Sequence, residues 1–326
     1  MTTKATVKGE TFAAQHDGDV LYIEGDRYFY LDGAGKVVDQ GGFETPGEKR
    51  VRMRNSDGLG DFVAVELTPD RAALKGSVRI MGGILQVEMG LSSAAAPVQL
   101  PTPSSLHEAA ELGDVSAIRR FVSAGSKIDE LVDGASPLML AAYHCHPSAV
   151  QELLKDGART DLVSGNGKSA LILAVESGNA EGVRLLLAKK ADVGFRGGKN
   201  KASPIVIAVG NGDLEVSQML VEAGANLRDE DQYGNSLLCI AAMGGLQEGG
   251  FPDVVKFLLE KKLDPNQGGT GSLTPLMNAV VDHSPQVVRL LLDYGADPKV
   301  AFPPGHPIDE YAGNSPEILK LLETRH

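Results

Sequence analysis

The stretch Ser136-Pro137-Leu138-Met139-Leu140-Ala141-Ala142 decides the fold, because close variants of it recur along most of the chain. Ser followed by Pro is typical of a helix start, since the hydroxyl can cap free backbone N–H groups and Pro suits the first turn. Leu138, Ala141 and Ala142 then lie at i, i+3 and i+4, which predicts one narrow apolar stripe. The related stretches begin at Ser104, Ser169, Ser203, Ser236 and Thr274, so successive intervals are 32, 33, 34, 33 and 38 residues.

Each repeat also ends alike, in a leucine-rich run closed by Gly-Ala, as at residues 153–158, 220–226 and 291–297. Gly at that point favours a left-handed C-cap. The two motifs in constant register resemble the ankyrin repeat, with its 33-residue period and T-P-L-H-x-A pattern. The resemblance covers about residues 104–326 and implies an all-α solenoid of about six to seven repeats. A single repeat cannot bury its own apolar face, so stacking supplies the core.

Four residues depart from the glycines expected at turns: Lys190 and Lys262 after the second helix of their repeats, and Cys145 and His283 between the two helices. A left-handed residue other than Gly costs on the order of 1 kcal/mol. We therefore expect the array to be less stable than an idealised one that has Gly at every such turn. The 38-residue interval places an insertion near residues 246–250.

Residues 1–97 show a different hydrophobic pattern, in which short apolar runs are separated by Gly, Asn or Pro. This spacing predicts a small antiparallel β barrel or sandwich. Residues 98–103 contain two prolines and predict a short linker, so the expected domains are 1–97 and 104–326. The expected strands are residues 20–23, 28–31, 50–54, 61–67, 74–80 and 84–89.

The composition of the 326 residues, with 42% apolar and 23% charged side chains, indicates a globular chain. A formal net charge of −12 argues against nucleic-acid binding. Apolar runs are shorter than the roughly 20 residues of a membrane span, and no signal peptide is visible, so we expect no membrane association. Cys145 and Cys239 are too few for a disulfide framework, which favours a reducing, cytoplasmic setting. The missing signal peptide and the modest length are typical of a bacterial or cytosolic protein.

Motifs for chemistry are incomplete. Residues 165–169 end like a phosphate-binding loop, but Leu162 replaces a required Gly. Residues 229–234 begin like a calcium loop, yet Ile240 stands where its bidentate Glu belongs. His144-Cys145-His146 offers too few ligands for a tetrahedral metal site. We therefore expect no catalytic residues, no metal and no cofactor, and a chain that is not an enzyme.

In the ankyrin family, partners usually contact the hairpin tips and the first helices, and the resemblance implies the same here. Residues 104–326 contain 20 Lys and Arg residues against 29 Asp and Glu residues, so most of the excess acidic charge of the chain lies there. This excess suggests a basic partner. Aromatic residues and Met are favoured anchors. The candidate partner-binding residues are Tyr143, His144, Glu176, Ser177, Lys199, Asn211, Gln232, Tyr233, Met243, Phe251, Val281 and Asp282.

The predicted function is a non-enzymatic, monomeric protein-interaction module. Two alternatives stay open. One is an immunity or antitoxin protein that neutralises a basic toxin, in which case one small partner would bind tightly. The other is an enzyme or ligand-binding protein whose site lies in residues 1–97, where Arg50, Arg52 and Arg54 alternate along one expected strand.

Overall fold

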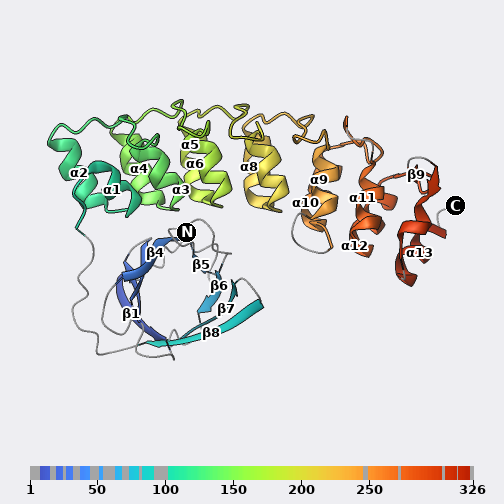
Figure 1. Cartoon of the computed structure of the whole chain (residues 1–326), viewed down its shortest axis with the longest axis horizontal. Helices are drawn as coiled ribbons and strands as arrows, with labels where there is room; N and C mark the ends of the chain where they lie inside the picture. The colour runs from blue at the N-terminus through green and yellow to red at the C-terminus, as the bar shows by residue number, and fades with distance from the viewer. Residues whose placement is uncertain are drawn as a thin grey trace. The chain divides into compact units, whose positions relative to one another are not determined.

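The computed structural model describes residues 102–323 apart from 245–248, 271–272, 303–304 and 314, together with the backbone of eight strands between residues 8 and 91 (Figure 1). Most of the predicted linker and most of the insertion lie outside the described residues. The chain divides into two compact units, which are described separately below. The units are residues 1–165 with 169–191, and residues 166–168 with 192–326.

The helices of the first unit form three antiparallel pairs, one pair in each repeat. The first helices α1, α3 and α5 stack on one another, and the second helices α2, α4 and α6 stack behind them. Each pair therefore buries its apolar stripe against the next. The helices are α1 (Leu106–Glu111), α2 (Val115–Ser123), α3 (Pro137–Tyr143), α4 (Pro147–Lys155), α5 (Ala170–Glu176) and α6 (Ala180–Ala188).

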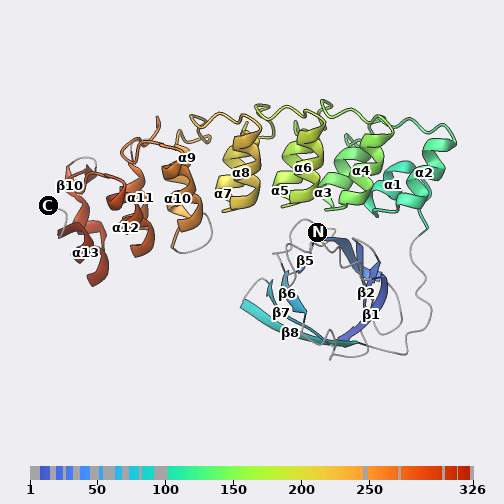
Figure 2. The ribbon, with the colours of Figure 1, turned by 180° about the vertical axis from the view of Figure 1, so that it is seen from behind.

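The second unit repeats this arrangement and ends in a shorter element. First helices α7, α9 and α11 stack in order, as do second helices α8, α10, α12 and α13. Figure 2 shows these pairs from behind, with α7 beside α8. The elements are α7 (Pro204–Gly210), α8 (Leu214–Glu222), α9 (Leu237–Met243), α10 (Pro252–Glu260), α11 (Pro275–Val281), α12 (Pro285–Asp293), β9 (Ala301–Phe302), β10 (His306–Pro307), the 3-10 helix η1 (Ile308–Tyr311) and α13 (Pro316–Glu323).

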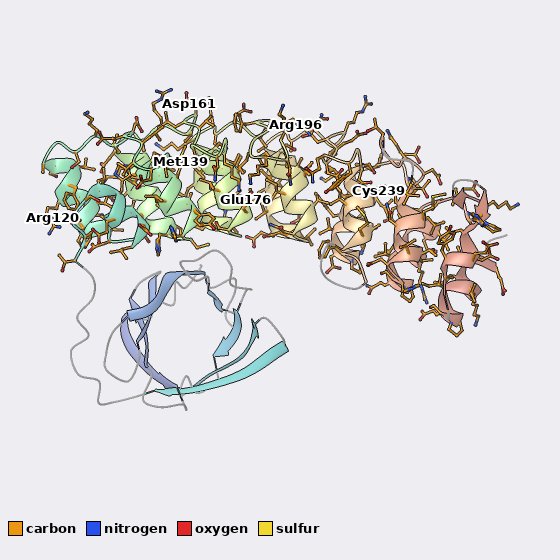
Figure 3. All side chains as sticks on the ribbon, in the orientation of Figure 1. Arg120, Met139, Asp161, Glu176, Arg196 and Cys239 are labelled. Atoms are coloured by element: carbon orange, nitrogen blue, oxygen red, sulfur yellow. The ribbon has the colours of Figure 1, made fainter. Side chains whose placement is uncertain are left out.

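The predicted stripe is the core of each repeat. Leu138 is 1% exposed, and Ala141 and Ala142 are fully buried. Met139, labelled in Figure 3, is also buried. Small Ala side chains let neighbouring first helices approach closely, and burying each Leu contributes about 2 kcal/mol before conformational entropy is subtracted.

The first helices begin where the Ser or Thr residues predict. The Ser136 hydroxyl accepts a hydrogen bond from the Met139 N–H at 3.3 Å, and the Thr274 hydroxyl accepts one from the Met277 N–H at 3.3 Å. Ser203 is the N-cap of α7 by position, but its side chain makes no such bond. Local capping chemistry therefore sets the start of most repeats.

The four turn residues that replace Gly adopt the left-handed conformation. Their φ angles are 56° for Cys145, 60° for Lys190, 65° for Lys262 and 52° for His283. This confirms that the repeats keep the turn geometry although the side chain carries a Cβ. Each such position costs on the order of 1 kcal/mol.

The strands before residue 92 pair antiparallel with their neighbours in sequence, and β1 also pairs with β8, so the ladder returns to its first strand. In β2 and β3, Val20 lies opposite Leu31 and Glu24 opposite Arg27. The strands are β1 (Lys8–Ala14), β2 (Val20–Glu24), β3 (Arg27–Leu31), β4 (Val37–Glu44), β5 (Val51–Met53), β6 (Val63–Leu67), β7 (Ala73–Ile80) and β8 (Gly83–Leu91).

Candidate protein-binding surface

The hairpin tips that join successive repeats form a ladder of backbone hydrogen bonds. Within the first unit, the Gly165 N–H donates to the Gly134 carbonyl at 2.8 Å. Within the second, the Gly198 N–H donates to the Gly167 carbonyl at 2.9 Å. Each tip is thus held by its neighbour, and side chains at the tips project from a braced backbone.

Tyr233 is the most exposed large apolar residue of the part that the structure describes, at 74%. The Asp231 carboxylate accepts hydrogen bonds from the Tyr233 N–H at 2.8 Å and from the Asn235 N–H at 2.9 Å. These bonds fix the turn that presents the ring. Gln232, beside it, is exposed as well.

Four of the predicted contact residues occupy the last position of a first helix. Tyr143 ends α3, Glu176 ends α5, Met243 ends α9 and Val281 ends α11. Val281 is 49% exposed, whereas the other three are half-buried.

The structure therefore separates the predicted contacts into two zones, the hairpin tips and the far ends of the first helices. In the first unit, Figure 3 shows Asp161 on the hairpin side and Glu176 toward the opposite end of the helices. A seven-residue helix spans about 10 Å. A partner that touches both zones must therefore cover the whole length of the first helices.

Two predicted contact residues are buried, so their predicted exposure is wrong. Ser177 is fully buried, and its hydroxyl lies 3.0 Å from the carbonyl oxygens of both Ala142 and Ala174. His144 is 8% exposed and packs edge-on against the Tyr143 ring, with centroids 5.1 Å apart. Both follow the last helical residue, where the side chain turns back onto the neighbouring repeat.

Asp282 has a structural task that the sequence reasoning missed. Its Oδ2 atom accepts hydrogen bonds from the N–H groups of Gly249 and Gly250, at 3.0 and 2.9 Å. The Ser284 hydroxyl donates to the Gly249 carbonyl. The end of the insertion is therefore anchored to the following repeat. Asn211, which follows first helix α7 as Asp282 follows first helix α11, is exposed.

Phe251 packs against the preceding repeat rather than pointing into open space. A Cβ added to Gly212 would lie only 2.4 Å from the Phe251 Cδ1 atom, so the ring lies directly on this glycine. Gly212 connects α7 to α8, and Phe251 directly precedes α10. Phe251 thus places an aromatic ring at the N-cap of α10, whereas the N-cap side chains of α2, α6, α8 and α12 accept a hydrogen bond from their first turn.

Exposed apolar residues also occur at hairpin tips of the first unit, outside the candidate partner-binding residues. Leu131 is 46% exposed, Val132 is 45% and Val163 is 42%. The backbone bond between Gly165 and Gly134 holds these two tips together. The signal available in the sequence was aliphatic residues at positions that the repeat does not need for packing.

The side chains that the sequence analysis considered for metal or nucleophilic chemistry are engaged within the fold. The Cys145 thiol donates to the Ser177 carbonyl at 3.2 Å, and His146 Nε2 lies 2.9 Å from the Glu111 carbonyl oxygen. Burial raises the pKa of the Cys239 thiol. A thiol with a raised pKa is a poor nucleophile at neutral pH. Among the described residues, no three His, Cys, Asp or Glu side chains gather as a metal site would require.

Comparison with known proteins identifies the repeats. The family model for ankyrin repeats (3 copies) matches residues 106–197, 189–267 and 205–301, which together exceed half of the chain. The chain belongs to the ankyrin repeat family. The expected all-α repeat array is thereby confirmed, while the division at residues 98–103 stays a prediction. None of the described helices combines the length and apolarity that a membrane crossing needs.

This ankyrin-repeat chain spans less than half the length of each of the following two relatives. It is 34% identical over 135 residues to the phosphocholine transferase AnkX of Legionella pneumophila, a match covering 40% of this chain and 14% of that protein. It is 33% identical over 195 residues to the mouse B-cell lymphoma 3 protein homolog, covering 58% of this chain and 41% of that protein. Because the chain matches less than half of either relative, the activities of those proteins do not transfer to it.

A solved structure shows the same repeat architecture. The ankyrin repeat domain of human ASB11 superposes with a TM-score of 0.60 at 28% identity, covering 69% of this chain and 98% of that domain. The shared part is the array of helix pairs.

Proposed function

We propose that the ankyrin array is a non-enzymatic protein-interaction module that contacts a partner through its hairpin tips and the ends of its first helices. The observation that carries this proposal is Tyr233, an aromatic ring 74% exposed on a turn held by its own hydrogen bonds. Because most of its surface is exposed, this side chain contributes little to the packing of its repeat. Aromatic anchors are where binding energy concentrates in protein interfaces.

The test uses the full-length chain immobilised as bait for proteins of its host, with retained proteins quantified by mass spectrometry. Tyr233→Ala is expected to reduce retention of the main partner about 30-fold, as for an anchor worth about 2 kcal/mol. Tyr294→Ala is the matched control, because Tyr294 is also exposed, at 43%, but caps second helix α12.

The expected pattern is a loss with Tyr233→Ala and none with Tyr294→Ala, at unchanged melting temperatures. Val281→Ala and Met243→Ala extend the test to the first-helix zone. If all of these variants retain the partner as well as the unaltered chain does, the proposed surface is wrong.

We further propose that residues 8–91 form a small antiparallel barrel that folds separately from the repeats, and that the chain acts as a monomer in the cytoplasm. The continuous strand pairing from β1 back to β8 supports the first statement. Limited proteolysis tests it, since cleavage is expected between residues 92 and 103. Early cleavage inside the strands instead would exclude a stable barrel.

A further inference from the structure

Two lysines at one hairpin tip of the second unit make no ion pair with any residue that the structure describes. Lys199 and Lys201 are both exposed and flank Asn200 at the end of the hairpin. Lys168, on the preceding tip, lays its side chain along Gly198. The hairpin tip that carries Lys199 and Lys201 therefore presents two exposed ammonium groups.

The carboxylates on the next tip are already engaged by the fold. Asp229 is paired with Arg196 at 3.4 Å, and its side chain is only 13% exposed. Glu230 accepts hydrogen bonds from the Thr270 N–H at 2.9 Å and from the Thr270 hydroxyl at 2.7 Å. The Asp231 carboxylate caps its own turn. Each of these carboxylates thus already accepts hydrogen bonds or an ion pair within the fold.

Arg196 holds the basic tip and the aromatic tip side by side. Its guanidinium donates to the Lys201 carbonyl at 3.0 Å and to the Glu230 carbonyl at 2.8 Å. Figure 3 shows Arg196 on the hairpin side of the unit. Lys199, Lys201 and Tyr233, together called the tip surface below, consequently stand on adjacent, mutually braced hairpins.

We infer that the tip surface binds an acidic, extended segment of a protein partner, with Asp or Glu side chains of that segment paired to Lys199 and Lys201. Tyr233 supplies apolar contact to the same segment. This inference rests on the proposed function and names the chemistry of its partner. It reverses the expectation of a basic partner that total charge suggests, because contact is made by the groups left unpaired at the tips.

The experiment measures fluorescence anisotropy of a labelled peptide of six Glu-Gly repeats titrated with the full-length chain. Peptides of Gln-Gly and Lys-Gly repeats of equal length are the comparison probes. Binding of the acidic peptide is expected to be strongest, and to weaken as salt is raised to about 150 mM. The double variant Lys199→Gln/Lys201→Gln is expected to weaken it about fivefold, the effect of losing two exposed ion pairs.

The control Lys256→Gln/Lys320→Gln removes the same charge from exposed positions on second helices α10 and α13 and should change the affinity less than about twofold. Equal binding of the three peptides overturns the inference. So does an acidic-peptide affinity that survives loss of Lys199 and Lys201. Either result leaves the proposed function standing if Tyr233→Ala still releases the partner, whereas retention by that variant counts against the function itself.

Discussion

Replacing Glu152 with Gln is expected to weaken the contact between the first two repeats, and to do so in a pH-dependent way. Glu152 on α4 accepts two hydrogen bonds from Arg119 on α2, both at 2.9 Å, and one from Lys155 at 2.9 Å. The Arg119 hydrogen bonds first, and then the Lys155 bond, lower the Glu152 pKa from 4.5 to about 2, against the opposing effect of burial.

The magnitude follows from linkage between protonation and folding. A full shift from 4.5 to about 2 would correspond to about 3 kcal/mol at neutral pH. The Arg119 and Lys155 side chains are 60% and 67% exposed, so solvent screens the pair and the expected contribution is about 1 kcal/mol.

The sign is set by a folded-state pKa below the unfolded one. Glu152 therefore stabilises the fold fully above pH 4.5, and this contribution is lost as the pH falls toward 2. Urea denaturation followed by circular dichroism, at pH 7 and at pH 3, measures it. Glu152→Gln should cost about 1 kcal/mol at pH 7 and clearly less at pH 3.

Glu181→Gln is the matched control, because Glu181 pairs with Arg184 inside a single helix and is more exposed. It should cost less than about 0.5 kcal/mol at either pH. An equal cost of Glu152→Gln at pH 7 and pH 3 would refute the reasoning, since the charge of the carboxylate would then be irrelevant.

Three further changes test the turns and the insertion. Lys262→Gly should raise the free energy of unfolding by about 1 kcal/mol, because φ at Lys262 is 65°, and thermal denaturation measures it. Gly212→Ala should lower it by at least about 2 kcal/mol through collision with Phe251, whereas Gly224→Ala, with open space around it, should cost only about 1 kcal/mol of backbone strain. Asp282→Ala should speed hydrogen exchange at Gly249 and Gly250 by about tenfold, whereas unchanged exchange would show that the carboxylate does not anchor the insertion.

The helices and turns of the repeats could be predicted because local rules determine them. Ser136 and Thr274 start helices through bonds to residues three positions ahead, and these depend only on the local sequence. The left-handed Lys190 and Lys262 followed from their register in the repeat. Each of these features needs no knowledge of the neighbouring repeat.

The candidate surface was predicted less well, because exposure of a side chain depends on the repeat beside it. His144, Ser177, Asn211 and Asp282 occupy equivalent positions after the first helix, yet two are buried, one is exposed and one binds the insertion. Their exposure and bonding differ because the adjacent repeats differ. Ser177, for example, is buried where its hydroxyl donates to the Ala142 carbonyl of the preceding repeat. Register alone cannot distinguish these cases.

The same limit applies to charge. Residues 104–326 carry 29 acidic and 20 basic residues, and that excess alone favours a basic partner. Yet a partner at short range meets particular atoms, and at the tips Asp229, Glu230 and Asp231 already hold hydrogen bonds or an ion pair. The ammonium groups of Lys199 and Lys201 form no ion pair with any residue that the structure describes. Long-range charge steers diffusion, whereas contact chemistry selects the bound segment. An acidic segment that binds this array would therefore associate slowly against the overall field and be held by the few cations at the tips.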